Sequence, residues 1–321
     1  MHSFEELSRD FSKQFSTRHF PEQPFSLYDP AEYFLGIGGK RIRPVLCLMG
    51  NELFDVINPD AFPVATAIEL FHNFTLIHDD IMDKAPLRRG MQTVHEKYGE
   101  PTALLSGDVM LVVAYDYLNK IKPFYIQKII HLFNKTAKQV CEGQQLDMNF
   151  EKQETVQFSD YLKMIELKTS VLLAASLQLG AILGGAQEGN QRHLYEFGKN
   201  LGMAFQVQDD YLDAFGDPEK FGKQVGGDIL ANKKTFLMIH AVQAGSESQV
   251  KELKRLMAEN PTDKVNQVLH IFRESGIDKW AFELKEKYVA EAFKHLDEIA
   301  VLSTRKQPLK ELAHFLIQRE H

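Results

Sequence analysis

The sequence predicts an all-α fold, organised as a single large helical domain over residues 1–321. Apolar residues recur at helical spacing along nearly the whole chain. Alternating patterns typical of β-strands are scarce, and no long linker rich in serine, glycine or proline divides the chain. Glycine and proline cluster between the expected helices, at 36–39, 99–101 and 222–227. These observations favour one helical domain over several smaller ones.

Two long helices are expected in the first half of the chain. In 61–83, apolar side chains such as Val64, Ile68 and Phe71 follow helical spacing. A second helix is expected to begin at Pro101, where the first turn tolerates proline, and to run to about Leu118. Its stretch 109–114 is apolar on nearly every face, which predicts a buried central helix.

Two further long helices are expected at 161–183 and 191–215. The pair Gly184–Gly185 ends the first, and Gly216 ends the second. Shorter amphipathic helices fill the C-terminal third of the chain.

Composition and charge exclude some classes of protein. Apolar residues make up 44% of the chain, enough for a substantial core, and the net charge is −7. A protein that binds a nucleic-acid backbone usually has an excess of basic residues, so we do not expect a nucleic-acid partner. An excess of acidic residues fits better with a protein that holds metal cations.

The two cysteines, Cys47 and Cys141, form neither a disulfide framework nor a zinc-ligand cluster. We expect both to be reduced thiols in the core, which fits a reducing, cytoplasmic compartment. The N-terminal MHSFEELSRDF is acidic and amphipathic, so no signal peptide is predicted. No uninterrupted apolar stretch reaches the ~20 residues of a membrane span, and we expect a soluble protein.

Two acidic clusters with the pattern Asp-Asp-x-x-Asp lie at the ends of long apolar helices, at 78–83 and 206–213. Residues four apart share a helix face, so Asp79 aligns with Asp83 and Asp209 with Asp213. Like charges at this spacing destabilise a helix, and they oppose the dipole at its C-terminus. A single cluster of this kind is explained equally well as a solvated helix end. Two clusters favour divalent metal, and oxygen-only ligands favour magnesium.

Basic residues occur in short groups beside glycines or near the acidic clusters. These groups are Gly38–Pro44, Arg88-Arg89-Gly90, Lys168-Thr169, Lys223 and Asn232–Thr235. Each basic pair alone is typical of surface charge, but Lys168 lies among apolar residues. Together they suggest two phosphate sites, because cationic side chains bind phosphate oxygens strongly. One site would use metals between the acidic clusters, and the other would use basic residues alone.

These motifs resemble those of the all-trans isoprenyl diphosphate synthases, the group that includes farnesyl and geranylgeranyl diphosphate synthases. The likeness covers about residues 30–240 in the same order, and the C-terminal third matches only in helical character. The matching motifs are GGKRIRP at 38–44, HDDIMD at 78–83 with RRG at 88–90, KT at 168–169, FQVQDDYLD at 205–213, and GKQVGGDI with NKKT within 222–235.

The resemblance implies a homodimer of helical bundles, each with its active site in a central cavity. It implies that isopentenyl diphosphate is condensed with dimethylallyl, geranyl or farnesyl diphosphate and that pyrophosphate is released. Three Mg²⁺ ions per active site are implied. The protein is expected neither to bind nucleic acid nor to span a membrane.

The resemblance also assigns roles to residues. Isopentenyl diphosphate would be held by Gly39, Lys40, Arg43, His72 and Arg89. The allylic diphosphate would be held by Arg88, Lys168, Lys233 and the metals, with Lys223 close by. Asp79, Asp83 and Asp209 would be the metal ligands, Asp80 and Asp213 would support them, and Thr169 and Gln206 would face the allylic carbon.

The chemistry follows from the placement of charge. Metals and cations would stabilise the leaving pyrophosphate, so that the allylic carbon–oxygen bond ionises. The cation would be shielded from water, and isopentenyl diphosphate would attack it. No Ser/His/Asp set suggests a protein nucleophile.

Product length is expected to depend on the helix that carries the first cluster. At 1.5 Å per residue, Phe74 lies roughly 7.5 Å and Phe71 roughly 12 Å before Asp79. By resemblance, small Thr75 and large Phe74 set the pocket floor, and one aromatic there is typical of the C20 product. The C15 product is the alternative, and Met110 could also shorten the pocket. Replacing Phe74 with alanine is expected to lengthen the product.

Three rival functions are weighed against this one. A metal phosphohydrolase would use His72 and His78-Asp79, but it leaves the second cluster and the basic motifs unexplained. A class I terpene cyclase has no second diphosphate for the segment Gly38–Pro44 to bind. A non-catalytic partner subunit is expected to have lost aspartates, whereas both triplets are intact.

Overall fold

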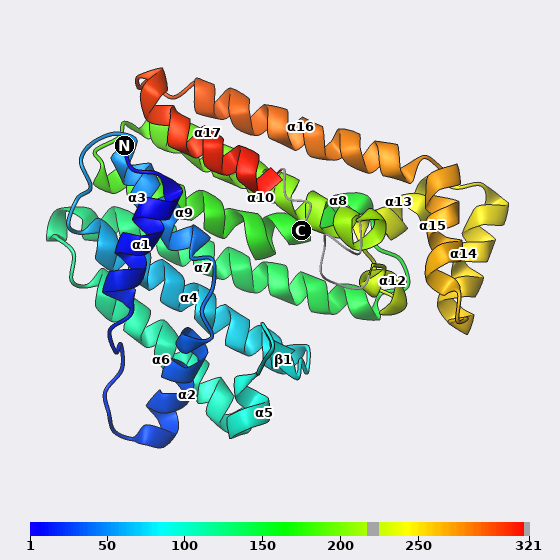
Figure 1. Cartoon of the computed structure of the whole chain (residues 1–321), viewed down its shortest axis with the longest axis horizontal. Coiled ribbons are helices and arrows are strands. Elements are labelled where there is room, and N and C mark those ends of the chain that lie inside the picture. The colour runs from blue at the N-terminus through cyan, green and yellow to red at the C-terminus, as the bar shows by residue number, and fades with distance from the viewer. Residues whose placement is uncertain (217–224, 318–321) are drawn as a thin grey trace. The chain divides into compact units, whose positions relative to one another are not determined.

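The computed structural model describes residues 1–216 and 225–317. This part of the chain is almost entirely helical, which confirms the predicted all-α class. The strands β1 (Leu87–Arg88) and β2 (Met91–Gln92) form one antiparallel pair. The helices are α1 Phe4–Phe15, α2 Phe25–Gly36, α3 Ile42–Glu52, α4 Ala61–Met82, α5 Val94–Tyr98, α6 Glu100–Leu118, α7 Pro123–Lys152, α8 Phe158–Ile165, η1 Glu166–Ser170, α9 Val171–Leu183, α10 Glu188–Phe215, α12 Gly227–Leu230, α13 Phe236–Ala244, α14 Glu247–Glu259, α15 Lys264–Glu274, α16 Ile277–Asp297 and α17 Ser303–Ile317 (Figure 1).

The four expected long helices all form, with small shifts at their ends. They correspond to α4, α6, the continuous stretch α8–η1–α9, and α10. The third begins at Phe158, three residues earlier than expected, and η1 is a π-helical turn within it. Such turns are rare and recur at functional sites.

One expectation about α6 is wrong. The stretch 109–114 was predicted to be buried, and Met110 and Ala114 are, but Val112 is 59% exposed. Leu104 and Leu105 of the same helix are also exposed. An apolar composition says only that the side chains avoid water. It does not say whether this chain or another surface covers them.

The chain divides into two compact units. The first comprises Met1–Phe133, Ser176–Gln191 and Val301–Pro308, and the remaining residues form the second. The helices α7, α9, α10 and α17 each contribute residues to both units. The expectation of a single domain over 1–321 stays a prediction.

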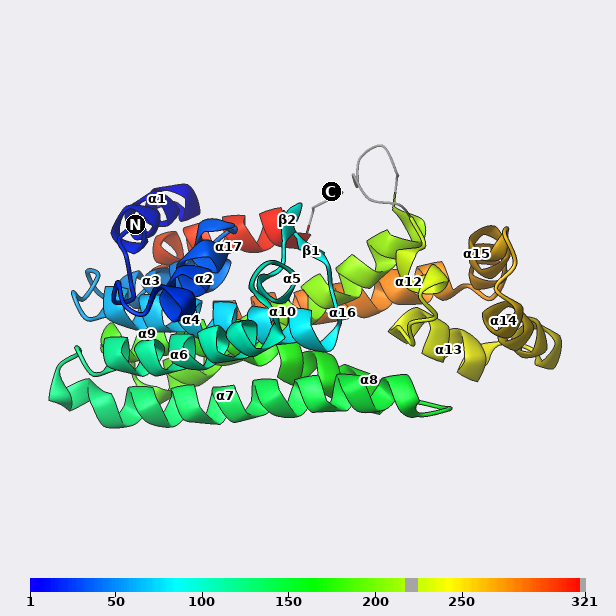
Figure 2. The ribbon, with the colours of Figure 1, turned by 90° about the horizontal axis from the view of Figure 1, so that it is seen from below.

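In the first unit, α4 packs along α6 and also against α3 (Figure 2). Every residue of α3 from Pro44 to Glu52 is buried, so this helix is a core element. Cys47 lies within it, and burial raises the pKa of its thiol. The prediction of a core thiol is thus right for Cys47 and wrong for Cys141, which lies on the exposed side of α7. α7 is amphipathic, and Cys141 lies on its polar, solvent-exposed face.

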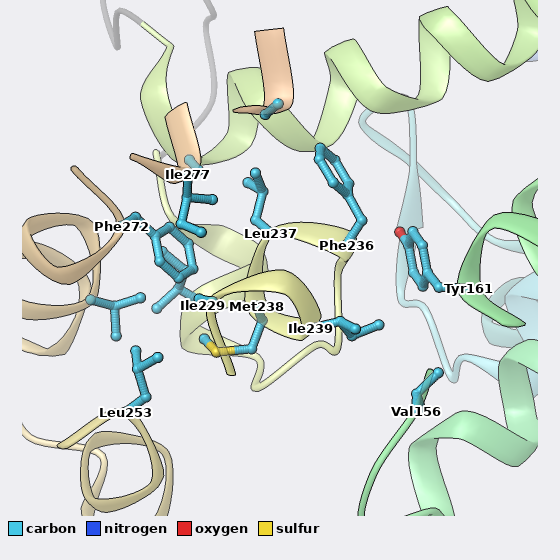
Figure 3. Packing of buried hydrophobic residues seen from close by; sticks show 14 of the residues in the cluster. Val156, Tyr161, Ile229, Phe236, Leu237, Met238, Ile239, Leu253, Phe272 and Ile277 are labelled. Carbon is cyan, nitrogen blue, oxygen red and sulfur yellow. The ribbon is translucent and has the colours of Figure 1, made fainter. Parts of the chain in front are cut away.

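The core of the second unit gathers around α13. Phe236 and Leu237 pack with Leu253 of α14, Phe272 of α15 and Ile277 of α16 (Figure 3). Each fully buried side chain of this kind contributes roughly 1.5–3 kcal/mol relative to exposure. This core fixes the start of α13, which directly follows the motif Asn232–Thr235.

By length and composition, one helical stretch of the described chain, Phe158–Leu183, is able to cross a membrane. In the structure 72% of its most apolar window is buried, as in the core helix of a globular protein.

His240 of α13 stacks on Trp280 of α16, with ring centroids 3.5 Å apart and an interplanar angle of 11°. Burial lowers the pKa of His240 below its usual 6.5. Below that pH the unfolded chain therefore binds more protons at this position than the folded one does. The stability that the neutral imidazole contributes is present above about pH 6.5 and is lost as the pH falls through the folded-state pKa.

We therefore expect His240 to lower the urea midpoint, followed by fluorescence of the single tryptophan, between about pH 7.5 and pH 5.5, while Asp210, whose pKa burial raises to about 7, acts in the opposite direction. In His240→Gln the midpoint should therefore fall less, or rise more, than in the wild type over this range, because both proteins retain the contributions of Asp210, His19 and His72. The exposed His270 of α15 gives a control, His270→Gln, that should behave as the wild type. An unchanged pH dependence in His240→Gln would contradict the argument.

Candidate active site

The first acidic cluster lies at the C-terminal end of α4. Asp80 is buried, and Arg88 Nε donates to both of its carboxylate oxygens at 2.9 Å. Arg88 Nη2 adds a bond of 2.7 Å, so the pair is bidentate. Asp79 is partly exposed and Asp83, which caps the helix, is exposed. Asp80 is therefore neutralised internally, while Asp79 and Asp83 lie one turn apart.

The hairpin β1–β2 directs Arg88 toward this cluster. Arg89 and Gly90 at its tip both have positive φ, 52° and 78°, as tight two-residue hairpin turns require. Arg88 therefore reaches back to Asp80, while the guanidinium of Arg89 packs against Gly39. A Cβ atom at Gly39 would lie 2.8 Å from Arg89 Nη1, so a side chain there would displace Arg89.

Arg43 and His72 form the centre of a basic cluster in the same unit. Arg43 Nη1 donates to His72 Nε2 at 3.0 Å, so that nitrogen carries no proton. Burial and the nearby Arg43, Arg89 and Arg88 hold the pKa of His72 well below its usual range. Burial, opposed by Glu69 and aided by Arg89, lowers the pKa of Arg43 to about 10.

Arg43 Nε is buried and has no hydrogen-bond partner among the described residues. Buried donors are nearly always paired, so this one points to a ligand. Three cations around a neutral histidine create a site that favours an anion.

Arg41, between Lys40 and Arg43, has a different role. It adopts a left-handed φ of 50°, pairs with the buried Glu69, and donates to Leu35 O at 3.1 Å. Its guanidinium lies 4.8 Å from the ring centroid of Phe15. Arg41 therefore has a structural role, through its contacts with Glu69 and Leu35, whereas Lys40 is exposed.

The second acidic cluster lies at the C-terminal end of α10, in the second unit. Asp210 is buried and accepts a 2.7 Å hydrogen bond from Tyr161 Oη. Burial, with the charges of Asp228 and Asp209, raises the pKa of Asp210 to about 7. Asp213 holds the start of α12, because its Oδ2 accepts from Asp228 N at 3.0 Å and its carbonyl accepts from Gly226 N at 2.6 Å. Asp209 is partly exposed.

Lys233 and Lys234 of the NKKT motif point to different partners. Lys233 Nζ lies 2.8 Å from Asp228 Oδ1. Burial lowers the pKa of Lys233, but the bond to Asp228 and the charges of Asp210 and Asp147 outweigh burial and raise it overall. Lys234 Nζ instead donates to Phe150 O at 2.8 Å, near the end of α7. Lys223 lies outside the described residues.

Lys168 and Thr169 lie on the π-helical turn η1, and both are partly buried. Lys168 Nζ lies 2.5 Å from Asp147 Oδ2 of α7. Gly143, one turn before Asp147, allows this approach, because a Cβ atom there would lie 2.3 Å from Lys168 N. Gln206 of α10 is also partly exposed.

Sequence reasoning assigned no role to four residues of these clusters, Tyr161, Asp147, Asp210 and Asp228, although Asp210 lies within the second acidic motif. A glycine inside the long helix α7 was the available signal for Asp147, since such a glycine usually has a packing reason. Tyr161 left no signal, because its pairing with Asp210 joins positions 49 residues apart.

The predicted residues gather within each unit. Those of the first unit are Gly39, Lys40, Arg43, Phe71, His72, Phe74, Thr75, Asp79, Asp80, Asp83, Arg88 and Arg89. Those of the second are Lys168, Thr169, Gln206, Asp209, Asp213 and Lys233.

The carboxylate clusters fit magnesium by the chemistry of their donors. Among residues 1–216 and 225–317, no three His, Cys, Asp or Glu side chains converge on one metal position. Magnesium does not need such a cage, since it is typically bound by one or two carboxylates, waters and substrate phosphates. Partly exposed aspartates on helix ends supply ligands of this kind.

Residues 25–274 match the model of the polyprenyl synthetase family. The chain belongs to the polyprenyl synthetase family. A geranylgeranyl diphosphate synthase of Methanosarcina mazei is 36% identical over 301 residues, covering 93% of this chain and 91% of that protein. The structure of a geranylgeranyl pyrophosphate synthase superposes with a TM-score of 0.94 at 42% identity, covering 100% of both chains. As a member of this family the protein is a prenyltransferase.

A third relative concerns metal and substrate. It is a polyprenyl synthase from Caulobacter crescentus, whose structure is complexed with calcium and isoprenyl diphosphate. It is 26% identical, with a TM-score of 0.84, and the match covers 99% of this chain and 98% of that one. The polyprenyl synthetase family is metal-dependent, in keeping with the carboxylate clusters of this chain.

Proposed function

We propose that the protein condenses isopentenyl diphosphate with an allylic diphosphate, releases pyrophosphate, and makes geranylgeranyl diphosphate. The observation that carries the proposal is the buried Arg43 Nε, which has no hydrogen-bond partner in the part of the chain that the structure describes and lies beside neutral His72 and the cation Arg89. This cluster suits a diphosphate that is bound by cationic side chains and not by metal. Isopentenyl diphosphate would be bound in this way. The C20 product is supported by relatives named geranylgeranyl diphosphate synthase.

Asp79, Asp83 and Asp209 would hold magnesium, with three ions per active site. Bound magnesium would neutralise the diphosphate as the allylic carbon–oxygen bond breaks. Asp80 and Asp213 keep the helix ends in place through Arg88 and the start of α12. Arg88 would reach the allylic diphosphate with the part of its guanidinium that does not bind Asp80.

Lys168 and Lys233 would bind the leaving diphosphate. A carboxylate orients the ammonium group of each, that of Asp147 for Lys168 and that of Asp228 for Lys233. Both would lie where negative charge develops during ionisation. Thr169 and Gln206 would face the allylic carbon, and the proton lost after attack would go to the departing pyrophosphate. The neutral His72 is bound by Arg43 and is not required as a base.

Phe74, Thr75 and Phe71 would form the floor of the product pocket. Thr75 Oγ1 donates to His72 O at 2.8 Å, so its hydroxyl turns back to the helix. Phe71 is buried, and Phe74, whose ring centroid lies 5.8 Å from that of Phe71, is partly exposed. An aromatic floor at this depth limits the tail to the C20 length.

The test is incubation with isopentenyl diphosphate, each allylic primer and magnesium, followed by chromatography of the products. Elongated prenyl diphosphates ending at C20 are expected. Phosphate release without elongation would favour a hydrolase. A hydrocarbon formed from the primer alone would favour a terpene cyclase.

We also propose that the protein is a homodimer and resides in the cytoplasm. An apolar stripe runs along α6, where Leu104, Leu105 and Val112 are 49%, 56% and 59% exposed. Apolar stripes of this kind mark interaction sites, and a second copy presents the same stripe about a two-fold axis. The absence of a disulfide at Cys47 and Cys141 among the described residues suits the cytoplasm.

Val112→Asp is expected to convert the dimer to a monomer, because it places a charge in the stripe that the proposed dimer would bury. Sedimentation velocity measures the change. Val56, which is 80% exposed on a loop of the same unit, gives the control Val56→Asp, which should leave the dimer intact. A wild-type protein that sediments as a monomer would contradict the proposal.

A further inference from the structure

Five aromatic rings form a continuous ladder in the first unit. His78, Phe74 and Phe71 lie on successive turns of α4, and Phe133 of α7 and Tyr115 of α6 continue the series. The ring centroids are 4.7 Å apart for His78–Phe74, 5.8 Å for Phe74–Phe71, 5.4 Å for Phe71–Phe133 and 5.5 Å for Phe133–Tyr115. Spacings of 4.5–7 Å with tilted or edge-on planes are those that favour aromatic pairs.

The first rung of the ladder is fixed by α6. His78 Nε2 donates to Leu104 O at 3.1 Å. Gly107 leaves room for the imidazole ring of His78, since a Cβ atom at position 107 would lie 2.4 Å from His78 Nε2. His78 in turn meets the ring of Phe74 at an interplanar angle of 66°. Phe74 therefore packs against a ring that two elements hold.

The two central rings of the series, Phe71 and Phe133, are 1% and 2% exposed. His78 and Phe74 are partly exposed, and Tyr115 at the far end is 37% exposed. The ring of Phe71 contacts those of both Phe74 and Phe133, the latter at an interplanar angle of 68°. Phe133 therefore supports Phe71 by direct packing, and it lies in a sequence region that no functional motif marks.

We propose that Phe133 is a positioning residue for product length and acts by bracing Phe71 as a second barrier behind Phe74. This inference rests on the proposed function, in which the growing tail runs along α4 from Asp79. A tail stopped at Phe74 never reaches Phe71. Once Phe74 is removed, the tail advances about one helical turn, roughly 4.5–5.4 Å, and meets Phe71. The packing of Phe71 against Phe133 then decides whether the tail stops there.

The layered arrangement predicts a conditional effect. Phe133→Ala alone should leave the C20 product unchanged, because Phe74 still closes the pocket. Phe74→Ala should lengthen the product, and Phe74→Ala with Phe133→Ala should lengthen it further by at least one isoprene unit. Leu132, the buried neighbour of Phe133, supplies the matched control Leu132→Ala, which should add nothing in the Phe74→Ala background.

Products of all five proteins, wild type included, are sized by chromatography, and circular dichroism confirms that each is folded. If Phe133→Ala unfolds the chain, Phe133→Leu in the Phe74→Ala background should give an intermediate shift. The inference is overturned if the double variant makes the same products as Phe74→Ala, or if Phe133→Ala alone lengthens the product. Failure of the proposed function would give a different result, since the wild type would then make no elongated prenyl diphosphate.

Discussion

Asp79→Ala and Asp209→Ala are each expected to reduce turnover by about 10³-fold or more, equivalent to at least ~4 kcal/mol of transition-state stabilisation. Each aspartate is a partly exposed carboxylate near the C-terminal end of a long helix, α4 or α10. There it adds negative charge where the helix dipole is already negative. Removing it should not harm the fold, and thermal stability without magnesium should stay the same or rise slightly.

The measurement is steady-state turnover at saturating substrates over a range of magnesium concentrations, with thermal melts alongside. Asp116 of α6 and Asp160 of α8 are exposed aspartates on helices of the same two units, so Asp116→Ala and Asp160→Ala serve as controls. Both controls should retain wild-type turnover. Near-normal activity in either test variant would remove that aspartate from the proposed metal site.

Lys168→Ala is expected to lower kcat/KM for the allylic diphosphate by about 10²-fold, or ~2.7 kcal/mol. Its ammonium lies on the π-helical turn η1 and is held by Asp147, so it is preorganised for an anion. Asp147→Asn should cause a smaller loss, because the ammonium stays but loses the carboxylate that orients it. The value of kcat/KM for isopentenyl diphosphate, measured at saturating allylic primer, should change less than that for the primer.

The double variant separates positioning from general stability. Since Asp147 acts through Lys168, Lys168→Ala with Asp147→Asn should be no worse than Lys168→Ala alone, whereas independent residues would give additive losses. Lys163 pairs with Glu166 on the same helical stretch and is exposed, so Lys163→Ala is a matched control without effect. Additive losses would show that Asp147 works by another route.

The fold class, the four long helices and the positions of both acidic clusters could be predicted from the amino-acid sequence. These features are local, because helical periodicity and the i,i+4 alignment of Asp79 with Asp83 need only neighbouring residues. Motif order was also sufficient to indicate the polyprenyl synthetase family, which the match over residues 25–274 confirms.

Which charged side chains pair inside the protein could be seen only in the folded chain. Asp80 and Arg88 neutralise each other, Arg41 pairs with Glu69, and Tyr161 holds Asp210. The exposure of Val112 and Cys141 was likewise decided by which helix faces the fold covers. Such outcomes depend on contacts between residues far apart in the chain. Desolvation and ion pairing at those contacts determine the ionisation and role of a side chain. Local sequence patterns do not indicate which side chains will be desolvated or paired.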